Sequence, residues 1–300
     1  MKAASWSVST RPWPAGTPIL ARPMPSSVID RQNAEFWNEL CGTAAARALG
    51  ITELSPENLR RFDEWYMTYY PYLEKYFRPA EIQGKRVLEI GLGYGTLGQV
   101  LALRGCRYHG LDIAANPVAM MRYRLSLLGL EGGPRVHVGS ALDIPYKAST
   151  FDCVYSIGCL HHTGDLGRGI SEVHRVLVKG GKAIVMLYNR HSFRHMIFLP
   201  ALHLRNLLLG RYKSQDGDTG FAKWVRAWYD KNQKGEAAPH TDYVSRAQAR
   251  ELFRGYTRVR IESQNFNDVV YKGKVLVPRE PLLNNLGRVM GADLYITATK

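Results

Sequence analysis

The stretch Val87-Leu88-Glu89-Ile90-Gly91-Leu92-Gly93-Tyr94-Gly95 decides the fold of this 300-residue chain. Its first residues form a short apolar run, which indicates a buried strand, and its glycines precede a segment of helical character at residues 96–104. Glycines at such a strand-to-helix turn permit positive φ angles and let the backbone approach a ligand closely. The stretch therefore predicts a nucleotide-binding turn.

An acidic residue follows the turn at the distance expected of a ribose-binding residue. Asp112 ends the next strand-like segment, about twenty residues after the glycines, where its carboxylate can accept hydrogen bonds from ribose hydroxyls. The pattern Gly93-x-Gly95-x-x-Gly98 also satisfies the dinucleotide fingerprint, so an NAD(P)-dependent oxidoreductase is one alternative. Glu89 argues against it, because a carboxylate there suits a ligand with an ammonium group and would repel a pyrophosphate. These residues favour S-adenosylmethionine over a dinucleotide.

Strand-like and helix-like segments alternate around this turn. Strands are expected at residues 86–90, 108–113, 135–139, 151–157 and 182–188, and helices at 96–104, 117–128 and 165–178. Such alternation predicts a mainly parallel sheet with helices on both faces and a ligand along the edge where the strands end. After residue 188 the rhythm breaks into helix-like pieces at 195–209 and 221–231, and strands are expected again at 257–264 and 293–299.

Five parts of the chain are expected from this organisation. They are a flexible, proline-rich leader (1–25), an N-terminal helical cover (26–80), a cofactor-binding core (81–188), a helical lid insertion (189–244) and a C-terminal segment that completes the sheet (245–300). Within the cover, residues 34–49 show helical spacing, and Ser55-Pro56 is a typical opening of a second helix.

Five motifs carry a family resemblance. In chain order they are VLEIGLGYG (87–95), GLDI (110–113), FDCVYS (151–156), LHHT (160–163) and RVLVKGG (175–181). Together they resemble the class I S-adenosylmethionine-dependent methyltransferases, especially the ubiquinone-biosynthesis-like branch of small-molecule enzymes. The resemblance implies an α/β, Rossmann-like sheet of seven strands, mainly parallel with an antiparallel last strand. It also implies in-line methyl transfer to an oxygen, nitrogen or carbon atom of a small-molecule acceptor.

The same resemblance implies which residues bind the cofactor. Three groups are expected: Glu89 with the backbone of Gly91, Gly93 and Gly95 at the methionine end, Asp112 at the ribose, and Ile113 at the adenine. In the family an acid at the end of the third strand usually bonds the adenine amino group, whereas this chain has Ser140 followed by Ala141. A serine oxygen can accept that hydrogen bond. Ser140 and Ala141 are therefore expected at the adenine, with Asp143 as a substitute.

Two histidines follow the fourth expected strand, near the place of the transferred methyl group. His161 or His162 would be able to remove a proton from an acceptor, and the alternative is that the pair only shapes the pocket. Methyl transfer requires little from side chains, because the sulfonium is already activated and positioning supplies most of the acceleration. A methyltransferase can therefore lack any recognisable catalytic residue. A separate alternative is a cofactor-binding protein that has lost catalysis and serves as a regulatory partner.

Acceptor specificity is expected from the parts outside the common core. Tyr66, Tyr69 and Tyr70 lie on one aromatic segment of the helical cover and are candidate substrate contacts, with plain packing as the alternative. Residues 195–209 are strongly apolar and flanked by basic residues. They are expected to form a lid, a contact in a homo-oligomer, or a peripheral membrane contact that reaches a lipid-linked acceptor.

The composition of the chain limits which kinds of partner are expected. The net charge is +14, and residues 189–300 hold most of the excess, with nineteen Lys and Arg against ten Asp and Glu. The basic residues are interspersed with acids and no RNA-binding module is recognisable, so a nucleic-acid substrate is disfavoured. The four cysteines form no C-x-x-C pair, no metal site is expected, and the absence of a signal-like or spanning segment predicts a cytoplasmic protein.

Overall fold

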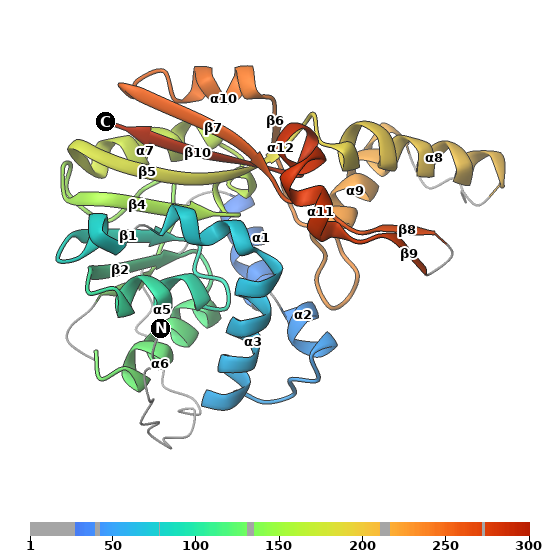
Figure 1. Ribbon diagram of the computed structural model, residues 1–300. Helices are drawn as coiled ribbons and strands as arrows, with labels where there is room; N and C mark the ends of the chain where they lie inside the picture. The colour runs from blue at the N-terminus through green and yellow to red at the C-terminus, as the bar shows by residue number, and fades with distance from the viewer. Residues whose placement is uncertain (1–27, 40–42, 78, 131–134, 211–216, 272–273) are drawn as a thin grey trace.

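Eight strands form one sheet in the computed structural model of the chain (Figure 1). Seven of them lie in the order β3-β2-β1-β4-β5-β10-β7, and the short β6 pairs with β5. Their bounds are Arg86–Ile90 (β1), Arg107–Asp112 (β2), Val136–Val138 (β3), Phe151–Ile157 (β4), Leu177–Asn189 (β5), Tyr243–Val244 (β6), Arg258–Gln264 (β7) and Asp293–Thr299 (β10). The structure describes residues 28–39, 43–77, 79–130, 135–210, 217–271 and 274–300, so the expected leader lies outside the described residues.

Strand direction places the ligand edge. β1 runs parallel to β2 and β4, and β4 runs parallel to β5, whereas β10 is antiparallel to both of its neighbours, β5 and β7. The first residue of β10, Asp293, therefore pairs with Tyr188 near the end of β5. The edge where β1, β2, β4 and β5 end is thus also the edge where β10 begins. The predicted α/β sheet, mainly parallel with an antiparallel last strand, is confirmed.

Helices cover both faces of this sheet. Their bounds are Val28–Trp37 (α1), Thr43–Ala48 (α2), Pro56–Tyr69 (α3), Pro79–Ile82 (α4), Thr96–Leu103 (α5), Ala115–Leu127 (α6), Leu166–Val176 (α7), Leu199–Leu208 (α8), Gly217–Tyr229 (α9), Arg246–Leu252 (α10), Arg279–Asn284 (α11) and Leu286–Met290 (α12). Ser55 caps α3 by accepting a hydrogen bond from the Asn58 amide at 3.2 Å, as the sequence predicts. The helical pattern at residues 34–49 is divided between α1 and α2, so the expectation of one helix there is wrong.

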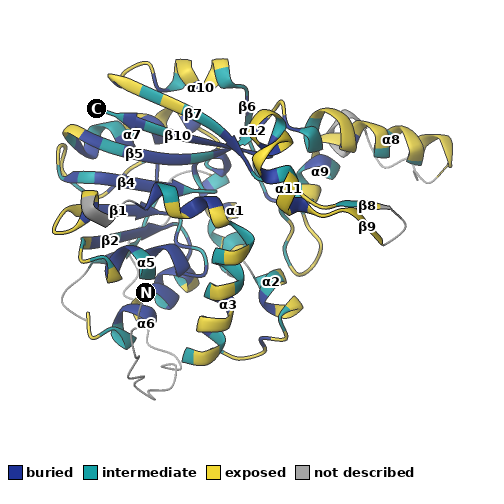
Figure 2. Cartoon of the chain, in the orientation of Figure 1, coloured by how far each residue is buried: buried dark blue, intermediate teal, exposed yellow. Residues whose placement is uncertain are grey.

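Two elements extend beyond the sheet on the same side of the molecule in Figure 1. One is α8, which follows a π-helical turn at Arg194–Phe198 and accounts for the helix expected at 195–209. The other is a hairpin of β8 (Val269–Tyr271) and β9 (Lys274–Val277), which the sequence analysis missed. Much of both elements is exposed (Figure 2). The division into five parts stays a prediction.

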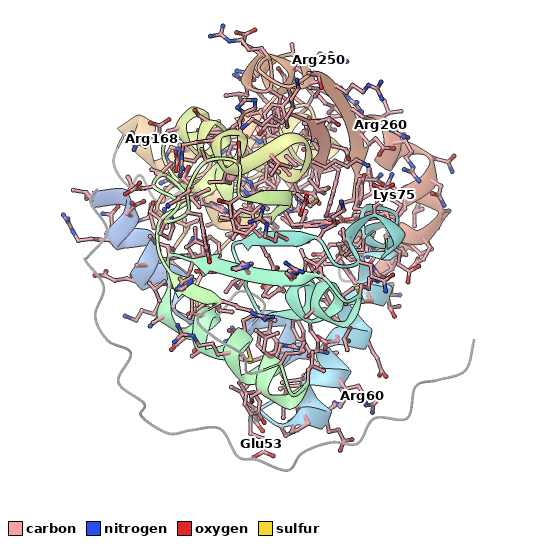
Figure 3. All side chains as sticks on the ribbon, turned by 90° about the vertical axis from the view of Figure 1, so that its left-hand side faces the viewer. Glu53, Arg60, Lys75, Arg168, Arg250 and Arg260 are labelled. Atoms are coloured by element: carbon pink, nitrogen blue, oxygen red, sulfur yellow. The ribbon has the colours of Figure 1, made fainter. Side chains whose placement is uncertain are left out.

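Charged side chains lie around the periphery of the sheet domain. Arg168, Arg250 and Arg260 project outward at its surface (Figure 3), and all three are exposed. These three arginines therefore do not converge on one groove, as recognition of a nucleic acid requires.

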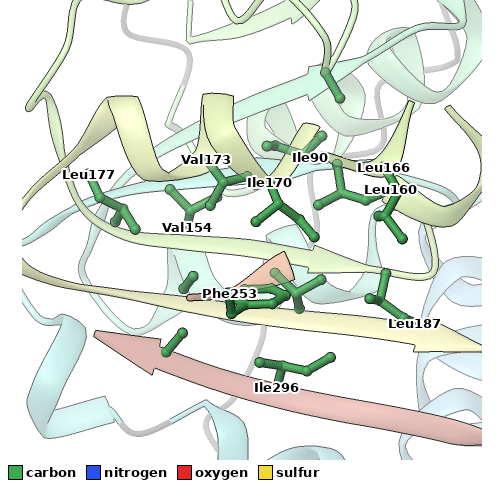
Figure 4. Close-up of a cluster of buried hydrophobic side chains, with 14 of the residues drawn as sticks. Ile90, Val154, Leu160, Leu166, Ile170, Val173, Leu177, Leu187, Phe253 and Ile296 are labelled. Atoms are coloured by element: carbon green, nitrogen blue, oxygen red, sulfur yellow. The ribbon is translucent and has the colours of Figure 1, made fainter. Parts of the chain in front are cut away.

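The apolar core lies in two layers, one on each face of the sheet. One layer packs Ile170 and Val173 of α7, together with Phe253, against Leu88 and Ile90 of β1 (Figure 4). Because successive side chains of a strand point to opposite faces, Val87 and Glu89 point to the other layer, which α5, α6 and the turn at Pro71–Tyr76 cover. Strand periodicity therefore carries Glu89 into the interior beneath the glycine turn.

Candidate active site

The glycine turn has the strained backbone that its sequence predicts. Gly91, Gly93 and Gly95 all have positive φ angles, of 82°, 51° and 81°. A Cβ at Gly91 would lie only 2.4 Å from the Cβ of Cys159, which follows β4. Both the φ angle and this close approach exclude a side chain there. The turn thus depends on glycine for packing as well as for conformation.

Asp112 holds the turn in place from the end of β2. Its two carboxylate oxygens accept hydrogen bonds from the backbone amides of Leu92 (2.7 Å) and Ala114 (2.9 Å). Burial raises the pKa of the carboxyl to about 6, and the backbone hydrogen bonds oppose that rise. Asp112 is therefore mainly ionised at neutral pH.

Glu89 is a buried carboxyl group within the same turn. It accepts a hydrogen bond from the Tyr108 hydroxyl, and burial raises its pKa to about 8. The group is thus mainly protonated at neutral pH when nothing cationic is near. An ammonium group beside it would favour the ionised form, so binding of such a ligand is coupled to release of a proton.

A cavity of about 510 Å³ joins these residues, and we call it the inner cavity. All eight residues expected at the cofactor line it: Glu89, Gly91, Gly93, Gly95, Asp112, Ile113, Ser140 and Ala141. The Ser140 hydroxyl accepts a hydrogen bond from the Leu142 amide at 3.1 Å, whereas the substitute, Asp143, is exposed and does not line the cavity. The structure therefore brings together three separate sequence segments at one edge of the sheet.

The two histidines have different surroundings. His161 is fully buried and does not line the inner cavity; its ring packs against Tyr188, with 4.1 Å between centroids. His162 lines the cavity, and its Nδ1 lies 2.8 Å from the backbone oxygen of His240. Because a carbonyl only accepts, Nδ1 carries the proton and the lone pair of Nε2 is free. Of the two histidines, only His162 lines the inner cavity, and its Nε2 is itself buried.

An acidic residue of the lid region completes the surroundings of His162. Asp230, directly after α9, places its Oδ2 3.6 Å from His162 Nε2 and accepts a hydrogen bond from the Tyr188 hydroxyl at 2.9 Å. Burial lowers the pKa of His162, and the negative charge of Asp230 opposes that fall. Sequence analysis missed Asp230 because it lies far from His162 in the chain, in a stretch without a motif.

A second carboxyl group that the sequence analysis missed lies at the start of β10. Asp293 is buried, lines the inner cavity and accepts a hydrogen bond from the Asn265 side-chain amide at 3.0 Å. Burial raises its pKa to about 7. The antiparallel register pairs Asp293 with Tyr188 and so places Asp293 at the ligand edge. Without that register, the position of Asp293 in the cavity could not be predicted.

A second cavity, of about 810 Å³, adjoins the first, and we call it the outer cavity. The two cavities share the wall residues Trp37, Ala44, Arg194, Tyr229, Asp230, Asn265, Asn267 and Ala292. The rest of the outer cavity includes the aromatic side chains of Phe36, Phe198, Trp224 and Trp228 and the charged residues Glu39, Lys231 and Asp268. Tyr66, Tyr69 and Tyr70 line the inner cavity and not the outer one, so the structure places these candidate substrate contacts beside the cofactor residues.

A buried ion pair between Arg124 and Asp63 stabilises the glycine turn, and its removal is expected to destabilise the protein. Arg124 is fully buried, donates to both carboxylate oxygens of Asp63 at 2.8 and 2.9 Å, and donates from Nε to the backbone oxygen of Tyr94 at 2.7 Å. We expect Arg124→Met to lower the free energy of unfolding by about 3 kcal/mol, because it leaves the Asp63 charge without its partner. Chemical denaturation measures the loss.

The matched control lies on the same helix as Asp63. Arg60 and Glu64 form an exposed pair on α3, with side chains 59% and 61% exposed. Arg60→Met should change the free energy of unfolding by less than about 0.5 kcal/mol, since solvent screens such pairs. Equal effects of the two substitutions would contradict a supporting role for Arg124.

Comparisons with known proteins agree with the geometry. A family model described as a methyltransferase domain matches residues 88–185. Among solved structures, a chain in the complex between the Haloferax volcanii Trm112 methyltransferase activator and the putative methyltransferase superimposes with a TM-score of 0.54. That match covers 79% of this chain and 92% of that one at 17% identity, and it supports the fold alone.

Curated relatives match part of the chain. Norajmaline N-methyltransferase of Rauvolfia serpentina is 33% identical over 35% of this chain and 36% of its own length. Fatty-acid O-methyltransferase of Mycolicibacterium smegmatis is 36% identical over 34% and 36%. Ubiquinone biosynthesis O-methyltransferase of Pseudomonas syringae pv. tomato is 30% identical over 49% and 61%. The chain therefore spans less than two thirds of each of these relatives. The ordered motifs, the sheet topology and these matches show that residues 88–185 form a domain of the class I S-adenosylmethionine-dependent methyltransferase type.

Proposed function

We propose that this protein transfers the methyl group of S-adenosylmethionine to an apolar small molecule held in the outer cavity. The observation that carries the proposal is the shared wall of the two cavities. The inner cavity holds the predicted cofactor residues, and the outer cavity begins at Tyr229 and Asp230, next to them. A donor and an acceptor in adjoining cavities are placed for direct in-line transfer.

The residues of the inner cavity fit this cofactor. Glu89 offers a buried carboxyl group to the ammonium of the methionine part, and Asp112 offers an acceptor at the end of β2 to the ribose hydroxyls. Ser140 and Ala141 would border the adenine. When bound, S-adenosylmethionine supplies a methyl group already activated by its sulfonium. The chain therefore needs to orient two ligands and exclude water.

His162 supplies the remaining chemistry, removal of a proton from an acceptor oxygen or nitrogen. Its free Nε2 faces Asp230 and has no hydrogen-bond partner among the described side chains. The Asp230 carboxylate would stabilise the imidazolium that forms when Nε2 takes the proton. His161 packs behind His162, where it can fix the ring but cannot reach a ligand.

The aromatic lining of the outer cavity supports an apolar acceptor. Trp224 and Trp228 of α9 provide large apolar surfaces, and Arg194 and Asp230 are the charged groups at the shared wall. The names of the relatives include both N- and O-methyltransferases. The acceptor atom in this chain therefore depends on the outer cavity, which lies mainly outside the matched residues.

Partners other than the acceptor are also part of this proposal. Residues 195–209 are proposed to make an external contact, because Leu204, Leu207 and Leu208 are each more than half exposed. We favour a peripheral membrane over a second copy of the chain, since two copies would each bring a net charge of +14. A cytoplasmic location stays a prediction.

Calorimetry with two cofactors tests the proposed function. We expect S-adenosylmethionine to bind with micromolar or tighter affinity and NAD to show no measurable heat, because the methionine ammonium gives the Glu89 carboxyl a cationic partner and the NAD pyrophosphate does not. A panel of phenols, carboxylic acids and amines then tests turnover. Binding of NAD would support an oxidoreductase, and tight S-adenosylmethionine binding without methylation of any acceptor would support a non-catalytic partner protein.

A further inference from the structure

An unusual amount of apolar surface is exposed on α8 and on the β8–β9 hairpin. Leu204, Leu207 and Leu208 share one face of α8, at i, i+3 and i+4, and Leu208 is 77% exposed. On β9, Val275 and Leu276 are also more than half exposed. Both elements extend from the same side of the molecule (Figures 1 and 2). Exposed apolar side chains gathered on two projecting elements indicate a site of interaction.

The outer cavity continues into this surface. Phe198, directly before α8, and Val269, the first residue of β8, both line the cavity. Phe198 and Trp228 line it while remaining 41% and 44% exposed. An apolar molecule in contact with α8 and the hairpin would therefore meet an apolar path toward the shared wall.

The charge of α8 and of the β8–β9 hairpin indicates which kind of partner this surface binds. Residues 199–209 and 269–277 contain Arg205, Lys272 and Lys274 and no acidic residue. Residues 189–300 as a whole hold nineteen Lys and Arg against ten Asp and Glu. A second copy would oppose this charge with the same sign, whereas an anionic lipid surface complements it. Among the described residues, no helix has both the length and the apolar character needed to cross a bilayer.

We propose that α8 and the β8–β9 hairpin together dock on an anionic bilayer and that the outer cavity receives an amphiphilic acceptor from the lipid. The apolar side chains of both elements would insert at the headgroup boundary, and the basic residues would lie among the lipid phosphates. Entry of an acceptor into the outer cavity depends on the proposed methyltransferase function. Docking itself does not.

Vesicle co-sedimentation with the full chain tests the docking. The vesicles are phosphatidylcholine with or without phosphatidylserine. We expect binding to the anionic vesicles, weakened by salt, and an affinity at least about tenfold lower for Leu207→Ser/Leu208→Ser and for Val275→Ser/Leu276→Ser. The control is Leu103→Ser on α5, where the side chain is 48% exposed but lies on neither element. It should bind like the parent, and all variants should retain their affinity for S-adenosylmethionine.

Three outcomes would overturn the proposal. One is that the parent does not bind anionic vesicles, and another is that the control loses as much affinity as the paired substitutions. The third is a dimer in sedimentation velocity that both paired substitutions dissociate, with vesicle binding unchanged, which would assign the surface to a second copy. Vesicle binding without any methylation would instead leave docking in place and contradict the proposed function.

Discussion

Gly91→Ala is expected to lower the affinity for S-adenosylmethionine by at least about a hundredfold. The new Cβ would lie 2.4 Å from the Cβ of Cys159 and 2.9 Å from its Sγ, at a φ of 82° that alanine adopts only at a cost of about 1–2 kcal/mol. Since both contacts are within the cavity wall, the turn must shift, and the part of the inner cavity expected to hold the methionine end shifts with it. Calorimetric titration of the variant measures the loss.

Two controls separate strain from collision. Gly84 has a similar φ of 70°, and no atom lies within 4 Å of the place that an alanine methyl group would take, so Gly84→Ala should retain full affinity with only a small loss of stability. Gly91→Ala combined with Cys159→Gly removes the collision but not the φ strain, and it should recover part of the affinity. Unchanged binding by Gly91→Ala would show that the turn does not contact the cofactor.

His162→Asn is expected to lower kcat by at least about a hundredfold with the affinity for S-adenosylmethionine nearly unchanged. An asparagine amide can still donate to the His240 oxygen, as His162 Nδ1 does at 2.8 Å, but it offers no base in place of Nε2. Burial lowers the pKa of His162 below its ordinary 6.5, so the neutral, basic form predominates at pH 7. The rate should therefore fall only as the pH drops below 6.5. Steady-state kinetics with an acceptor found in the panel test this.

Asp230→Asn provides the matched variant. The amide oxygen can still accept from the Tyr188 hydroxyl, whereas the negative charge near His162 Nε2 is lost. Because that charge favours the imidazolium, its removal should lower the pKa of His162 and move the acidic limb of the kcat profile to lower pH. An unshifted limb, or parallel losses of kcat and cofactor affinity in His162→Asn, would reduce His162 to a packing residue.

The inner cavity illustrates why part of a site can be predicted from sequence. Glu89, the glycines and Asp112 belong to two strand-to-helix turns whose residue types follow from local backbone geometry and ligand chemistry. Parallel strands end at one edge, so the alternation of elements is enough to bring these turns together. Ser140 and Ala141 are predicted in the same way, because they follow the end of the third strand. The eight predicted residues accordingly line one cavity.

The outer cavity and its junction with the inner one depend on tertiary structure alone. Asp230 meets His162 only because the segment after α9 folds back over the ends of β4 and β5, and Asp293 arrives there through the antiparallel register of β10. The β8–β9 hairpin has no helix-like or motif-bearing pattern, and local periodicity does not encode its place on the same side of the molecule as α8 (Figure 1). Short-range patterns therefore determined the residues of the proposed cofactor site. Contacts between residues distant in the chain decided what faces the acceptor, because loop packing has no local sequence period.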